Sequence, residues 1–178
     1  RGKIVKFIWT SPTSASQLRK YANSIRKLLN CTDKIAFPIL DILDYLMDEG
    51  VIIFQILDNN DPYFEENELA KFDYNENTIY AKEAVYREAI AGIGRSRFTL
   101  THELAHFILL RILNFEIFTM DKEPLPFQDP EWQANTLASE MLIPFNLTKD
   151  FSLEEVMEKC LVSEECALVN YDKKRRTR

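Results

Sequence analysis

The first fifty residues carry apolar and polar positions in the spacing of helices. Segment 15–29 repeats apolar residues every three or four positions, as an amphipathic helix does. Its apolar side consists of Leu18, Tyr21, Ile25, Leu28 and Leu29. Segment 35–47 has a similar pattern and is followed by Gly50, a residue type that often ends helices. The sequence therefore predicts a helical N-terminal part over about residues 14–50.

A strand pattern replaces the helical one at residue 51. Segment 51–57 is an almost continuous apolar run and predicts a buried strand. An acidic, Asn-rich stretch at 58–68 predicts an exposed loop. Segments 69–74 and 78–82, joined by Asn-Glu-Asn, predict a hairpin that completes a small sheet over about 51–83.

A second helical region starts near residue 95. Apolar residues of segment 95–113 lie around nearly the whole helix, which is typical of a buried helix. Segment 114–128, with two prolines, predicts a loop. Asp129 and Pro130 then suit the N-cap and first position of a helix over 131–143 that ends before Pro144.

Two helix starts are recognisable near the C-terminus. Ser152 and Glu155 form a capping-box pattern, and Ser163 precedes two glutamates that favour another helix start. We expect C-terminal helices over about 152–172, after the central helices at about 95–144.

The two histidines of the chain lie four residues apart in the central helical region. His102 and His106 therefore share one face of the helix, and Glu103 follows the first of them. This is the H-E-x-x-H arrangement of metal-dependent peptidases, in which two imidazoles hold Zn²⁺. The alternative is a pair of packing or capping histidines. A buried helix disfavours it, because imidazole nitrogens in an apolar core need a partner.

A catalytic zinc site needs a third protein ligand, and the chain has no third histidine. The candidates on the next helix are Glu131 and Glu140. Nine positions at about 100° per residue turn these carboxylates to opposite sides, so only one can face the metal. Glu131 lies at the edge of the apolar face and is the better ligand, whereas Glu140 is expected in solvent, with a buried hydrogen bond as the alternative. Asn135, one turn after Glu131, is either a support for a ligand or an ordinary polar residue.

Composition limits the class of protein. The 178 residues suit one domain spanning 1–178, and 46% hydrophobic residues are enough for a core. The net charge of −6 argues against direct binding of nucleic acid, and the basic run at 173–178 is expected to be a solvated tail. Three cysteines without a C-x-x-C predict reduced thiols in a cytoplasmic protein. No apolar run is long enough to cross a membrane.

Two blocks of this sequence together resemble the ImmA/IrrE family of zinc metallopeptidases. The first is Arg-Ser-Arg-Phe-Thr-Leu-Thr-His-Glu-Leu-Ala-His at 95–106, and the second is Glu-Trp-Gln-Ala-Asn-Thr-Leu-Ala-Ser-Glu-Met-Leu-Ile-Pro at 131–144. A Val-Ser-x-x-Cys-Ala segment at 162–167 echoes a shorter family motif. Leu137 and Met141 stand where the family often has Phe and Leu. The resemblance covers about residues 51–171.

The resemblance implies a fold, a site and a partner. The fold would be α+β and zincin-like (thermolysin-like), with a small mixed sheet packed on a helical core. Zinc would be held by His102, His106 and Glu131, and Glu103 would be the general base. Members commonly cleave a helix-turn-helix repressor, encoded on a mobile element or in a stress-response locus, and so switch on transcription. Recognition of DNA would then belong to the partner.

Three points stay open at the level of sequence. Tyr80, Tyr86 or Arg97 could donate a hydrogen bond to the oxyanion, and nothing selects one of them. Segment 78–82 is a candidate edge for an extended substrate. Besides the repressor-cleaving peptidase, the alternatives are a non-cleaving, zinc-bound module that sequesters a repressor and, less favoured, a general peptidase of short peptides.

Overall fold

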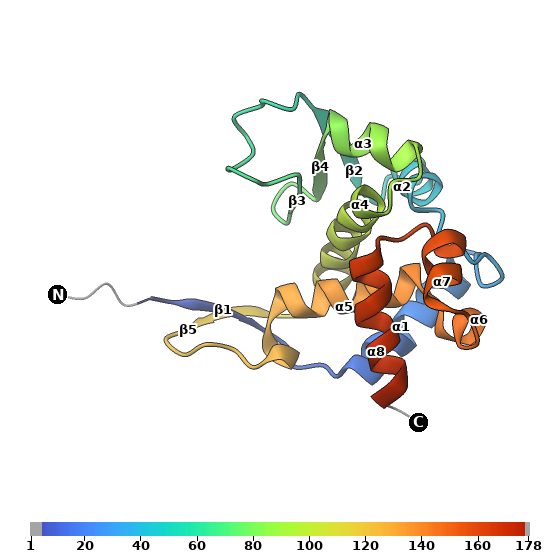
Figure 1. Ribbon diagram of the computed structural model, residues 1–178. Coiled ribbons are helices and arrows are strands. Elements are labelled where there is room, and N and C mark those ends of the chain that lie inside the picture. The colour runs from blue at the N-terminus through green and yellow to red at the C-terminus, as the bar shows by residue number, and fades with distance from the viewer. Residues whose placement is uncertain (1–4, 177–178) are drawn as a thin grey trace.

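The computed structural model describes residues 5–176, with side chains described up to residue 170. The chain forms helices and two small sheets, an α+β architecture (Figure 1). The elements up to the middle of the chain are β1 (Phe7–Thr10), α1 (Ala15–Leu28), α2 (Ile39–Asp48), β2 (Ile53–Leu57), β3 (Ala70–Asp73), β4 (Thr78–Lys82) and α3 (Glu83–Ile90). The remaining elements are α4 (Gly94–Phe107), the π-helical turn η1 (Ile108–Ile112), β5 (Ile117–Met120), the 3-10 turn η2 (Pro126–Gln128), α5 (Pro130–Leu142), α6 (Phe145–Thr148), α7 (Leu153–Cys160) and α8 (Glu164–Arg176).

Most predicted helices are confirmed, and their ends follow the expected local chemistry. The Asp129 side chain accepts a hydrogen bond from the Glu131 N–H at the start of α5. Ser152 and Glu155 form the predicted capping box of α7. The second helix begins later than predicted, at Ile39 instead of residue 35, because Pro38 disfavours helical geometry in the residue before it. The basic run predicted as a tail at 173–178 lies outside the residues whose side chains are described.

The three-stranded sheet has the order β2-β4-β3. The predicted hairpin is confirmed as β3 and β4, which pair antiparallel with Phe72 opposite Ile79. β2 pairs parallel to β4, so β4 is the central strand. The expectation of an open edge at 78–82 is therefore wrong, and the edge beside α4 is β3. The expectation that 51–57 is buried is also wrong, because β2 is an edge strand and Ile53 is 51% exposed.

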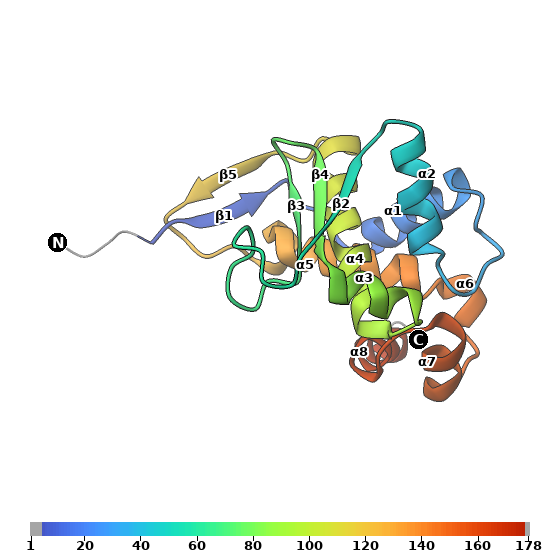
Figure 2. The same cartoon turned by 90° about the horizontal axis from the view of Figure 1, so that it is seen from above.

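A second sheet joins distant parts of the chain. β1 and β5 pair antiparallel, with Phe7 opposite Met120, and form an arm that projects from the helices (Figures 1 and 2). The prediction of a loop over 114–128 missed β5, and no strand was predicted at β1. Each strand is only four residues long, so neither shows enough alternation to be recognised alone.

The core lies around α4 and α5, which pack against each other. On its other side α5 packs against α1, while α4 also contacts β3 (Figure 1). The buried side chains of Leu100 and Leu104 confirm that α4 is a buried helix, as predicted. Within the described residues no helix is both long and apolar enough to cross a membrane. All three cysteines are buried thiols.

Candidate metal centre

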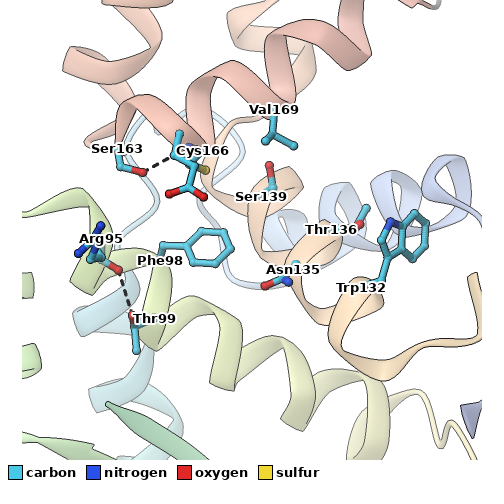
Figure 3. A pocket seen from close by; sticks show the side chains of 11 residues that line it. Arg95, Phe98, Thr99, Trp132, Asn135, Thr136, Ser139, Ser163, Cys166 and Val169 are labelled. Carbon is cyan, nitrogen blue, oxygen red and sulfur yellow. Dashed lines mark hydrogen bonds between the residues drawn. The ribbon is translucent and has the colours of Figure 1, made fainter. Parts of the chain in front are cut away.

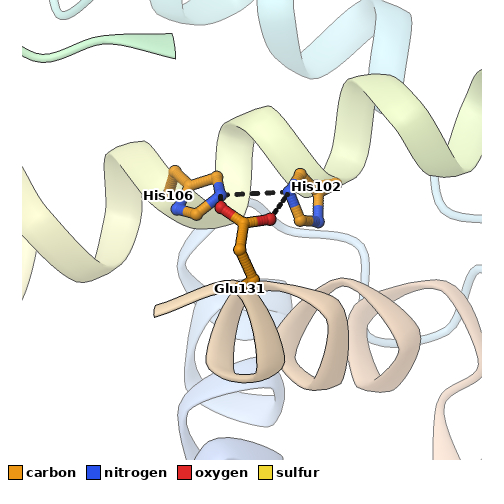
Figure 4. Close-up of side chains that lie close together, drawn as sticks. All are labelled: His102, His106 and Glu131. Carbon is orange, nitrogen blue, oxygen red and sulfur yellow. Dashed lines mark hydrogen bonds and ion pairs between the residues drawn. The ribbon is translucent and has the colours of Figure 1, made fainter. Parts of the chain in front are cut away.

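The two histidines of α4 point together toward the first turn of α5. Their Nε2 atoms are 3.0 Å apart. His102 Nε2 lies 3.2 Å from Glu131 Oε2, and His106 Nε2 lies 3.0 Å from Glu131 Oε1 (Figure 4). The structure therefore brings together the three side chains that the sequence selected as metal ligands.

The spacing of these donor atoms fits a small metal ion. A tetrahedral zinc ion with ligands at about 2.0–2.1 Å separates its donor atoms by about 3.3 Å. The three separations of 3.0 to 3.2 Å are close to this value. Two facing imidazole nitrogens and a carboxylate also form a donor set that zinc commonly takes in proteins. These three residues can hold a metal ion.

The environment of the group favours a charged carboxylate. Hydrogen bonds with the two histidines hold the pKa of Glu131 well below its ordinary value. Burial opposes the charged form of His102, but Glu131, Glu103 and Asn135 outweigh it and raise its pKa. A metal cation between these groups would neutralise the carboxylate charge and bind both ring nitrogens.

Glu103 lies on the same helix but faces the sheet. It is 9% exposed, and its Oε2 accepts a 2.7 Å hydrogen bond from the Phe72 N–H of β3. Burial raises the pKa of this carboxyl group. The Phe72 N–H points away from β4, since Leu69, three positions earlier, faces β4 through its hydrogen bond to Lys82. The edge strand therefore fixes the position of the carboxylate beside the histidine pair.

Arg111 ties the edge strand to the far end of the same helical segment. It lies in the π-helical turn after α4, donates a hydrogen bond to the Tyr74 carbonyl, and stacks on the Tyr74 ring at 4.1 Å. Neither Arg111 nor Phe72 is recognisable from the sequence as part of this site. Phe72 contributes its backbone N–H, a group that every non-proline residue has, so its residue type does not reveal this role. Arg111 contacts a residue 37 positions away in the sequence.

Glu140 lies in a different environment from the one favoured by its sequence position. The favoured expectation of a solvated side chain is wrong and the alternative of a buried hydrogen bond holds, because the side chain is 3% exposed and forms an ion pair with Arg19, with a 2.9 Å distance from Nε to Oε2. Arg19 also lies over the Phe145 ring. The reason is that α1 covers the side of α5 opposite to α4. The helical geometry itself was right, because Glu131 and Glu140 face different neighbours.

The three candidate oxyanion donors have other partners. Arg97 is buried and donates to the carbonyl groups of Phe37 and Leu161, which joins α4 to distant loops. Tyr80 donates to the Glu76 carboxylate. The Tyr86 ring packs at 6.1 Å from the Phe54 ring. None of these contacts directs a donor toward the histidine pair.

The start of α4 depends on a glycine, Gly94. A Cβ atom at Gly94 would lie 2.5 Å from the backbone of Val162 and Ser163. Only glycine permits the turn between α7 and α8 to approach α4 so closely. The glycine was not recognisable as special, since the turn it contacts is almost seventy residues away in the sequence.

Comparison with known proteins agrees with this geometry. The family model of the IrrE N-terminal-like domain, Peptidase_M78, matches residues 64–166, a range that contains both histidines and Glu131. A search of the curated proteins gave no match.

Proposed function

Because the chain belongs to the M78 metallopeptidase family of IrrE N-terminal-like domains, we propose that it is a zinc-dependent endopeptidase that cleaves a helix-turn-helix repressor. Cleavage would switch on the genes of a mobile element or a stress response. The observation that carries the proposal is the convergence of His102, His106 and Glu131 at donor separations of 3.0 to 3.2 Å.

In this proposal the two histidines and Glu131 are the zinc ligands. When bound, zinc supplies a Lewis acid that polarises the substrate carbonyl and lowers the pKa of a water molecule to about 7. α4 carries both histidines, and the cap at Asp129 fixes the first turn of α5, which carries Glu131. Asn135 follows one turn later and is proposed to steady His102, in line with its contribution to the raised pKa of that residue.

Glu103 is the proposed general base. It follows His102 directly, and the Phe72 N–H holds its carboxylate in place. In the reaction it would take a proton from the attacking water and deliver that proton to the leaving amine. Burial favours the protonated form of this carboxyl group. Glu103 can therefore hold the proton between its removal from water and its delivery to the amine.

β3 is the proposed docking edge for the substrate backbone. Its outward N–H at Phe72 reaches Glu103, so this edge borders the metal centre. Extended peptides commonly bind by adding a strand to such an edge. The contact between Arg111 and Tyr74 holds the end of the same strand against η1. A substrate strand beside β3 would thus pass next to the proposed ligands and base.

The charge around β3 favours a basic partner. Residues 58–76, which include β3, contain seven Asp or Glu residues and one Lys. DNA-binding proteins carry Lys and Arg for contact with phosphates, so a repressor presents the complementary charge. The proposal therefore assigns DNA binding to the partner. It also places the protein in the cytoplasm, where a repressor meets its operator.

The test is cleavage of the helix-turn-helix repressor encoded beside the gene of this protein. Zinc-loaded protein should convert the purified repressor to discrete fragments, and a chelator should stop this. Glu103→Gln should bind the repressor without cutting it, whereas Glu158→Gln, at an exposed position on α7, should behave as the parent. If Glu103→Gln relieved repression in cells as well as the parent does, proteolysis would not be the output and sequestration would replace it.

A further inference from the structure

The arm formed by β1 and β5 projects from the helices as a ribbon of two strands (Figures 1 and 2). Its base is attached to α5, because Gln133 Nε2 donates hydrogen bonds to the carbonyl groups of Ser11 and Phe127. Beyond this base, every residue of β5 is exposed. A ribbon of two strands is only marginally stable in water, and a third strand or a packed helix is what stabilises it. The open side of the arm is therefore a candidate surface for another chain.

One side of the arm is covered by its own chain. The Trp9 indole N–H donates a 2.7 Å hydrogen bond to the Lys122 carbonyl. Nearer the base, the Thr13 N–H donates to the Phe127 carbonyl. Segment 121–128 thus runs back beside β1 (Figure 1), and the free edge of the ribbon is β5.

The hydrogen-bonding groups of this free edge point outward at two residues. The Ser11 N–H donates to the Glu116 carbonyl, which makes these residues a hydrogen-bonded pair. Such pairs alternate along an antiparallel ladder, so Ile117 and Thr119 turn their N–H and C=O groups away from β1. Among the described residues, neither of these N–H groups has a hydrogen-bond partner. The edge of β5 can therefore accept one more strand.

β5 also lacks the features that keep edge strands apart. Proteins usually protect such edges with Lys, Pro, a bulge or a cover. The strand reads Ile-Phe-Thr-Met, and its three apolar side chains are 49%, 40% and 43% exposed. This composition favours pairing with a strand of the same kind.

We propose that β5 pairs with β5 of a second copy of this chain, antiparallel around a two-fold axis at Phe118. In this register Ile117 of each copy exchanges hydrogen bonds with Thr119 of the other, since both residues have outward groups. Phe118 faces Phe118 of the other copy in a non-hydrogen-bonded pair, where Cα atoms lie about 4.5 Å apart and aromatic side chains stabilise the pairing. The two ribbons would become one four-stranded sheet.

Charge favours a second copy as the partner, and size predicts a reversible dimer. Glu116, directly before β5, would lie opposite Met120 of the other copy. Asp121, directly after β5, would lie opposite Phe115. The register therefore brings no like charges face to face. A ladder this short buries less than the about 800 Å² per chain of a standard interface, so we expect a Kd on the order of micromolar.

The proposed interface does not include the candidate metal centre. A cavity lined by α4, α5, α8 and the turn at Ser163 lies next to the histidines, since the rings of Phe98 and His102 are 6.2 Å apart (Figure 3). The candidate ligands lie on α4 and α5. The inference therefore does not rest on the proposed peptidase, and circular dichroism gives a check of the fold that needs no zinc.

β2 offers a matched comparison, because it is another edge strand without charged residues. The Ile53 N–H donates to the Asn77 carbonyl, next to β4, so the N–H of Ile56 points away from β4. β2 already belongs to a three-stranded sheet and contacts α2. Proline at 56 or at 119 thus makes the same change on two edges, and only the second should affect the dimer.

Sedimentation equilibrium across the micromolar range tests the dimer. The parent should show a monomer–dimer equilibrium. Thr119→Pro should raise Kd at least tenfold, because Pro removes an outward N–H and leaves the hydrogen bonds to β1 in place. Ile56→Pro should dimerise as the parent does. A monomeric parent, or an equal effect of both prolines, would overturn the inference.

A second pair of variants avoids proline in the arm. Phe118→Lys would place two positive charges opposite each other and should also raise Kd at least tenfold. Leu168→Lys changes a side chain of similar exposure on α8, 42% against 40%, and should leave Kd unchanged. A dimer that survives Phe118→Lys is not formed by β5. If this variant weakened binding of a repressor while the parent stayed monomeric, the arm would be a docking surface for the repressor and the second copy would be the wrong occupant.

Disulfide cross-linking tests the register. Phe118→Cys would bring two thiols together across the axis at a separation that a disulfide can span, whereas Thr119→Cys places them two positions apart along the ladder. Under mild oxidation the first variant should form cross-linked dimer at least tenfold faster. The three cysteines of the chain are buried and should not interfere. Equal rates for the two variants would overturn the register and the proposed pairing with it.

Discussion

Glu131 and Glu140 lie on one helix, and their replacement by Gln should have opposite effects. Glu131→Gln should abolish tight zinc binding, since it removes a ligand carboxylate. Loss of a partner that only supports a ligand already costs about 10–100-fold in metal affinity, so loss of a ligand should cost at least a hundredfold. The metal-free protein should keep its stability to within about 1 kcal/mol, because ion pairs of exposed side chains contribute little and Glu131 is 64% exposed.

Glu140→Gln should keep the zinc but weaken the fold. It replaces a carboxylate that accepts two hydrogen bonds from Arg19, at 2.9 and 3.2 Å, by an amide that accepts only through its oxygen. Hydrogen bonds to charged groups contribute about 1.5–3 kcal/mol. Arg19 is 27% exposed and retains some water, so we expect a loss of about 2–3 kcal/mol rather than the larger cost of a fully buried charge. In a protein of this size, that lowers Tm by about 4–12 °C.

The assay combines two measurements on the same variants. Competition with a chromophoric chelator gives the zinc affinity, and thermal unfolding without zinc gives Tm. Glu158→Gln, an exposed change on α7, serves as the control and should alter neither quantity. Equal loss of zinc in folded Glu131→Gln and Glu140→Gln would refute the geometry. So would a lower metal-free Tm for Glu131→Gln than for Glu140→Gln.

Three further outcomes follow from the site. Glu103→Ala should be less stable than Glu103→Gln by about 1–3 kcal/mol in urea unfolding, because only Gln keeps an acceptor for the buried Phe72 N–H; equal stability would contradict that role. Gly94→Ala should lower Tm and reduce cleavage, since its Cβ would lie 2.5 Å from the backbone of Val162 and Ser163. A Tm equal to that of the parent would show that the turn at 162–163 can move away without cost. Zinc at about a hundred times its Kd should stabilise the protein by about 2.7 kcal/mol and raise Tm by about 5–11 °C, and a chelator should reverse this; no shift would argue against a zinc site.

Features that depend only on neighbouring residues were predictable from the sequence. The four-residue spacing placed His102 and His106 on one face of α4, and helical periodicity separated Glu131 from Glu140. The caps at Asp129 and Ser152 also appeared where the sequence predicted them. These features rest on 3.6 residues per turn and on hydrogen bonds within one turn, so no other part of the chain is needed to specify them.

The neighbours of each helix and strand depend on how the whole chain folds. Glu140 is buried because α1 covers that side of α5, and β4 is central because β2 adds to it from across the loop at 58–69. β1 and β5 are more than a hundred residues apart in the chain, and each is too short to be recognised without the other. The hydrogen bond from Phe72 to Glu103 uses a backbone group that every non-proline residue carries. Such contacts depend on how distant segments pack, and the local pattern of apolar and polar residues does not predict that packing.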